Sequence, residues 1–157
     1  VMIGGGPDQC VANVNKVKQV IAENGLDERV EWIGLVPFDQ YLQQVYDCHI
    51  LLSPSIRAED GDAEGGAPVL FTELSASGMP IISTFHCDIP EVVLHETSGL
   101  LANEGDLDKL ADMLENLVAN PAIWNRYAKA GRAHIEKEYN STIQGERLAA
   151  IYRELGQ

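Results

Sequence analysis

The stretch EGGAPVLFTELSASGMPIIST, residues 64–84, decides how the surrounding chain folds. It begins with glycines, and Pro68 follows at a position that suits the first turn of a helix, where a missing N–H is tolerated. The pattern predicts a helix that runs to about Ser77 and closes on Gly78. The apolar run from Pro80 to Thr84 then predicts a buried strand.

The same alternation of short apolar runs and amphipathic segments continues on both sides of this stretch. It is typical of βα units around a parallel sheet. We therefore predict an α/β fold, a parallel sheet with helices on both faces. The other predicted strands are 1–3, 30–33, 49–52 and the edge strand 99–102. Helices are predicted over 8–23, 89–94, 121–138 and 142–155, and a short one is capped by Asp39. A further helix is capped by Asp106, ends at 120–121 and has Leu107 and Val118 in its apolar stripe.

The composition is that of one globular domain over residues 1–157, with 45% hydrophobic and 22% charged residues. The 24 acidic residues outnumber the 11 basic ones, and the net charge of -13 argues against a nucleic-acid partner. No stretch approaches the ~20 apolar residues of a membrane span. The three widely spaced cysteines fit reduced thiols, so we expect a soluble, cytoplasmic protein.

The predicted sheet brings several unusual loops to one edge. Ligands of open α/β sheets bind beyond the carboxyl ends of the strands, so the loops after Ile3, Ile33, Leu52 and Thr84 should share one rim. The first of these loops contains three successive glycines, Gly4, Gly5 and Gly6, which have no side chain that could block a ligand. A bare turn is an equally good interpretation of these glycines.

The quoted stretch carries the more informative signal. Gly65 and Gly66 stand directly ahead of a helix whose first N–H groups are unpaired, and such a start suits a phosphate. The carboxylates of Glu64 and Glu73 can each accept two donors, which suits the vicinal hydroxyls of a ribose or a hexose. Phosphate on backbone amides and hydroxyls on carboxylates together describe a sugar nucleotide.

At this point the sequence also resembles a known family. Over residues 52–55, 60–65, 73–84, His86, 89–91 and 98–101 it is similar to the donor-binding domain of glycosyltransferase family 4, and within it to bacterial exopolysaccharide enzymes of the colanic-acid type. The resemblance implies the C-terminal, Rossmann-like half of the two-domain GT-B architecture. It further implies sugar transfer from a nucleotide-sugar donor to a glycan or lipid-linked acceptor with retention of configuration, without a metal or other cofactor.

Carried over residue by residue, the resemblance implies a catalytic position for Glu64, near the donor sugar, and contact of Glu73 with the ribose. The remaining donor-binding residues would be Gly65, Gly66, Ala67, Pro68, Gly4, Gly5, Gly6, Val36 near the base, and Arg57 as the basic residue near the site. Two departures stand out. Eight residues separate the two glutamates, one more than is usual in the family, and Cys87-Asp88 replaces a frequent glycine pair, which puts a phosphate contact there in doubt.

The resemblance also implies parts that do not precede residue 1. The family's first strand and basic helix of this domain are missing, as is the N-terminal acceptor domain, through which a peripheral membrane contact could arise. We therefore expect a fragment that binds donor weakly if at all, transfers nothing and can self-associate through exposed strand edges. Two alternatives stay open, a non-catalytic nucleotide-sugar binding or interaction module and a sugar-nucleotide epimerase of the same fold.

Other chemistry-bearing residues receive a structural interpretation. Adjacent residues seldom converge on one ion, so His86-Cys87-Asp88 is not predicted to bind a metal. His49 is expected to be a hydrogen-bonded core residue of its strand. The aromatic residues expected to pack in the core are Trp32, Trp124, Tyr127, Tyr139 and Tyr152.

Overall fold

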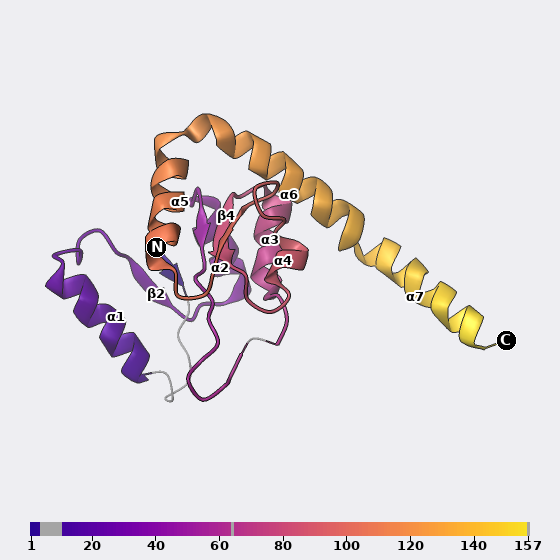
Figure 1. Cartoon of the computed structure of the whole chain (residues 1–157), viewed down its shortest axis with the longest axis horizontal. Helices are drawn as coiled ribbons and strands as arrows, with labels where there is room; N and C mark the ends of the chain where they lie inside the picture. The colour runs from indigo at the N-terminus through magenta and orange to yellow at the C-terminus, as the bar shows by residue number, and fades with distance from the viewer. Residues whose placement is uncertain (4–10, 64, 157) are drawn as a thin grey trace. The chain divides into compact units, whose positions relative to one another are not determined.

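The structure, a computed structural model, describes residues 1–3, 11–63 and 65–156 (Figure 1). The chain divides into two compact units, Val1–Cys48 and His49–Gln157, and each is described by itself. The predicted Glu64, Gly4, Gly5 and Gly6 lie outside the described residues. The prediction of one domain over residues 1–157 stays a prediction.

The first unit pairs two parallel strands, β1 (Met2–Ile3) and β2 (Trp32–Gly34). Its helices are α1 (Val11–Glu23) and α2 (Phe38–Tyr46). The strand predicted at residue 30 begins later, because the Val30 N–H donates to the Leu26 carbonyl and holds this residue in a turn. Asp39 is not the cap of α2 as predicted. Pro37 holds that position, and Asp39 lies in the first turn, where its charge suits the helix dipole.

The second unit contains a three-stranded parallel sheet in the order β3 (Leu51–Leu52), β4 (Ile81–Thr84), β5 (Leu100–Ala102). The β3–β4 connection contains α3 (Val69–Ser77), and the β4–β5 connection contains α4 (Ile89–Val92). The C-cap of α3 is Gly78 in the left-handed conformation, as predicted. Gly99 lets β5 approach β4, because a Cβ atom there would lie only 2.7 Å from the Ile81 carbonyl oxygen.

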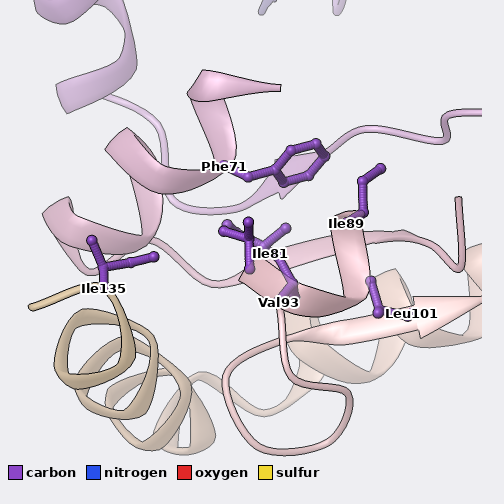
Figure 2. Close-up of a cluster of buried hydrophobic side chains, with 7 residues drawn as sticks. Phe71, Ile81, Ile89, Val93, Leu101 and Ile135 are labelled. Atoms are coloured by element: carbon purple, nitrogen blue, oxygen red, sulfur yellow. The ribbon is translucent and has the colours of Figure 1, made fainter. Parts of the chain in front are cut away.

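Two hydrophobic clusters cover the two faces of this sheet, because alternate strand residues point to opposite faces. Ile81 of β4 and Leu101 of β5 belong to the first cluster, which α3, α4 and α6 complete (Figure 2). Ile82, Leu100 and Ala102 belong to the second, which α5 and α6 complete. The predicted parallel pairing with helices on both faces is therefore confirmed for this unit.

The C-terminal third of the chain is helical. It contains α5 (Leu107–Ala119), a 3-10 turn η2 (Pro121–Ile123), α6 (Trp124–Glu138) and α7 (Ser141–Leu155). The predicted cap of α5 is confirmed, since the Asp106 carboxylate accepts the Lys109 N–H at 3.0 Å. Among the described residues, no helix is both long and apolar enough to cross a membrane.

Several expected core positions are exposed instead. His49 precedes β3 rather than forming part of it, and it is exposed with its ring 5.7 Å from that of Trp124. The strand begins at Leu51 rather than at the predicted residue 49, because pairing with β4 starts at Leu51 and Ile81. Other predicted core residues are exposed at the ends of the helices or after them; they are Leu107, Val118, Tyr139 and Tyr152.

Candidate functional site

Buried hydroxyl groups of β4 fix the first part of the loop that follows β3. Ser83 Oγ donates to the Ser53 carbonyl oxygen at 2.6 Å, and Thr84 Oγ1 donates to the Ser55 carbonyl oxygen at 2.5 Å. Both side chains are fully buried in the central strand, where a hydroxyl without a partner would be costly. The carboxyl ends of β3 and β4 therefore share one rim, as the sequence predicts.

Glu104 ties the third strand to the same rim. It follows β5, and its carboxylate accepts the backbone N–H of Arg57 at Oε2 (2.8 Å) and contacts His86 Nδ1 at Oε1 (2.7 Å). The Arg57 N–H, first, and the His86 hydrogen bond, second, hold the pKa of Glu104 below its usual value. Glu104 was not predicted as a site residue, although its place just after β5 puts it at the same rim as the loops after β3 and β4.

The loop after β4 contains a fully buried histidine and an exposed cysteine. His86 Nε2 lies 3.3 Å from the Sγ atom of Cys87, and Cys87 has a positive φ of 44°. That left-handed backbone is one that glycine adopts readily. The loop thus keeps a glycine-like conformation where Cys87 replaces a residue of the family's frequent glycine pair.

The start of α3 is open. Pro68 occupies the N-cap with no side-chain hydrogen bond to the helix, and Val69 is 70% exposed. Gly65 has a φ of 72°, and no atom lies within 4 Å of where its Cβ would stand. A Cβ atom at Gly66 would meet Asp88 Oδ2 at 3.8 Å. The corner therefore leaves its backbone approachable, with one acidic side chain beside it.

Glu73 is half-buried in the second turn of α3. Phe71 and Leu74 on either side of it are buried in the core. Within the described part of the chain, no hydrogen bond or ion pair involves the Glu73 carboxylate. A half-buried carboxylate without a protein partner is a good acceptor for the hydroxyl groups of a ligand.

The remaining predicted residues fall in three places. Ala67 packs against the first hydrophobic cluster. Arg57 is exposed, and its guanidinium donates to the Gly61 carbonyl oxygen at 3.4 Å within its own loop. Val36 is half-buried in the first unit, between β2 and α2. The structure thus brings Gly65, Gly66, Ala67, Pro68 and Glu73 together around α3.

Comparison with known proteins identifies the family. A sequence model described as "Glycosyl transferases group 1" matches residues 1–120. The chain belongs to this family. Its fold is the α/β, Rossmann-like fold predicted from the sequence, and it superposes on Anabaena Alr3699/HepE in complex with UDP-glucose with a TM-score of 0.81. The two sequences are 19% identical over 97% of this chain and 40% of that one.

Two relatives of this group 1 member carry names from polysaccharide biosynthesis. Amylovoran biosynthesis glycosyltransferase AmsK from Erwinia amylovora is 37% identical over 140 residues, which is 89% of this chain and 34% of AmsK. Putative colanic acid biosynthesis glycosyltransferase WcaL from Escherichia coli K12 is 30% identical over 146 residues, 89% of this chain and 34% of WcaL. The chain therefore spans about a third of the length of these relatives.

A cavity of about 600 Å³ lies elsewhere in the second unit of this group 1 chain. Residues of α5 and α6 line it together with the turn before β5, and it includes none of the predicted site residues. Its charged lining contains two basic residues, Lys109 and Arg126, and two acidic residues, Asp112 and Glu96, so it offers no net charge to an anionic ligand. The rim at α3 is the better candidate site because its backbone donors and carboxylate have separate, complementary roles.

Proposed function

We propose that this chain is the donor-binding half of a retaining glycosyltransferase that transfers a sugar from a nucleotide-sugar donor to a glycan or lipid-linked acceptor in polysaccharide biosynthesis. The observation that carries the proposal is the half-buried Glu73 carboxylate, which has no hydrogen bond or ion pair within the described residues and lies one turn beyond the uncapped start of α3. The activity belongs to the complete enzyme, with an acceptor domain supplied by the rest of the protein.

The two features bind different parts of one ligand in this proposal. The free N–H groups and the dipole at the start of α3 attract the diphosphate, whose negative charge grows as the glycosidic bond breaks. Glu73 accepts the two ribose hydroxyls. Gly65 and Gly66 let the diphosphate approach the backbone, and the family resemblance assigns Glu64 to the donor sugar. The acceptor hydroxyl attacks from the face that the nucleotide leaves, and no metal ion is needed.

The comparisons with known proteins give this assignment independent support. AmsK and WcaL are named for the biosynthesis of bacterial polysaccharides, and the HepE structure contains UDP-glucose. UDP-glucose and GDP-mannose, which differ in both base and sugar, are suitable probes of this site.

The first test is an NMR titration of the ¹⁵N-labelled chain with each nucleotide sugar. Binding should shift the amide signals of Gly65, Gly66 and Val69, with a dissociation constant of about 1 mM, because these 157 residues span only about a third of the length of AmsK and WcaL. Glu73→Ala should weaken binding by about 10- to 100-fold, the cost of losing hydrogen bonds to a charged group. Glu115→Ala, which removes the same charge from the exposed side of α5, is the matched control and should change nothing.

The second test uses the complete enzyme. Glu73→Ala should reduce the rate of sugar transfer by about 10- to 100-fold for the same reason, with or without a chelator present. Unchanged transfer by the variant would overturn the proposed role of Glu73 and favour a binding or interaction module.

In the NMR titration, amide shifts confined to residues away from the start of α3 would contradict the proposed site.

A further inference from the structure

Three side chains at the rim form a connected set that donor binding does not use. Glu104 Oε1 lies 2.7 Å from His86 Nδ1, and His86 Nε2 lies 3.3 Å from Cys87 Sγ. Cys87 is exposed, whereas His86 is fully buried behind it. A thiol, an imidazole within its reach and a carboxylate that orients the imidazole are the parts of an activated nucleophile.

The hydrogen-bond partners determine where the protons lie. Glu104 is held ionised by the Arg57 N–H and by His86, which lower its pKa, so its carboxylate acts as an acceptor. In the neutral tautomer that this acceptor favours, His86 donates from Nδ1 and presents the lone pair of Nε2 to Cys87. The thiol of Cys87 is the hydrogen-bond donor to that lone pair, and the imidazole is placed to take its proton.

We propose that Cys87 is a thiol modification site that exchanges with low-molecular-weight disulfides, with His86 as the proton carrier and Glu104 as its positioning residue. The sulfur of Cys87 attacks one sulfur of the disulfide as its proton passes to His86 Nε2. A new S–S bond forms, the S–S bond of the small molecule breaks, and the departing thiolate takes the proton from His86. One small thiol is released for each mixed disulfide formed, and no other oxidant is consumed.

Cys48 supplies a built-in comparison. It is only half-exposed, and its Sγ donates to the Gln44 carbonyl oxygen at 3.4 Å. A carbonyl oxygen cannot take the thiol proton as an imidazole can. The two thiols therefore differ in their proton acceptors as well as in their exposure.

A mixed disulfide at Cys87 would place new atoms beside the glycine corner, because the next residue, Asp88, already approaches Gly66. If the proposed donor function is correct, the modification excludes the nucleotide. This consequence depends on that function, whereas the exchange reaction does not.

The experiment treats the 157-residue chain with 2-hydroxyethyl disulfide, a neutral probe chosen because the protein carries a net charge of -13. Peptide mapping by mass spectrometry follows the adduct at each cysteine. The reference is a synthetic peptide of residues 83–91, which keeps His86 beside Cys87 but lacks Glu104. Cys87 of the folded chain should react about 100-fold faster than the peptide, the low end for a positioned base.

Two results would overturn the proposal. One is a rate at Cys87 in the folded chain that is no greater than that of the freely accessible peptide. The other is a folded Glu104→Gln variant whose Cys87 rate equals the wild-type rate. Glu59→Gln, an exposed change of the same charge in the neighbouring loop, should leave the Cys87 rate unaltered, and Cys48 should react equally in all these chains. A complete enzyme that binds no nucleotide sugar would refute the donor proposal, and the Cys87 exchange rates would be unaffected.

Discussion

The loop between β3 and α3 has two halves that treat their polar groups differently. In the first half, Ser53, Ser55 and Arg57 are each bonded to a side chain from β4 or from Glu104. In the second half, Gly65 to Pro68 leads into a helix start without a side-chain cap. The first half satisfies its polar groups within the protein and so contributes to stability. The second leaves donors available, which is what a ligand requires.

The largest expected effect is on the bonded half. Thr84→Val keeps the shape of the side chain but removes the donor to the Ser55 carbonyl, so the free energy of unfolding should fall by about 1–3 kcal/mol. Urea unfolding measures it. Thr97→Val, at an exposed position in the same unit, is the control and should change stability by less than about 0.5 kcal/mol. Equal stability of the two variants would mean that the hydroxyl contact does not hold the loop.

A smaller effect is expected at the open half. Asp88 places a negative charge beside Gly66, where we propose that the diphosphate binds. Asp88→Asn should therefore raise the affinity for UDP-glucose or GDP-mannose by about two- to fivefold, as for other exposed charge pairs. The gain should shrink as salt is added. Asp108→Asn on α5 makes the same change in net charge and should have no effect, as the NMR titration can show.

The smallest effect concerns the Glu104 carboxylate that joins the loops. The ionised carboxylate stabilises the fold, and because its pKa is lowered this contribution is fully present above the ordinary value of 4.5. The contribution is lost as the pH falls from 4.5 through the lowered pKa. The difference in unfolding free energy between wild type and Glu104→Gln should therefore narrow below pH 4.5. For Glu138→Gln the difference should be lost between pH 4.5 and about pH 2, since Lys137 and Arg147 hold the pKa of Glu138 at about 2. A difference at Glu104 that stays constant with pH would contradict the proposed cause of its pKa shift.

The sequence predicted the elements whose signals are local. Pro68 and Gly78 bound α3 to within a residue, and the apolar run before Thr84 forms β4. His49 was wrongly predicted to lie in the strand, because the sequence of residues 49–52 does not show at which residue pairing with the next strand begins. The first two residues of that run have no ladder partner, and His49 is exposed.

The connections at the rim were less accessible to sequence reasoning. Glu104 meets Arg57 across 47 positions of the chain, and no pattern in either segment specifies the other. The left-handed backbone at Cys87 was hidden because residues that adopt it readily are usually glycine or asparagine. By contrast, the open corner at Gly65 and Gly66 was predictable because glycines ahead of a helix are a local signal.

The placement of α6 has a practical consequence for dissecting the protein. Tyr127 belongs to one hydrophobic cluster and Ile135 to the other, so this single helix contributes to the core on both faces of the β3–β4–β5 sheet. The family match, however, ends at residue 120. A shortened version designed to stop there would expose both interiors, so any truncation intended to stay folded should extend through Ile135.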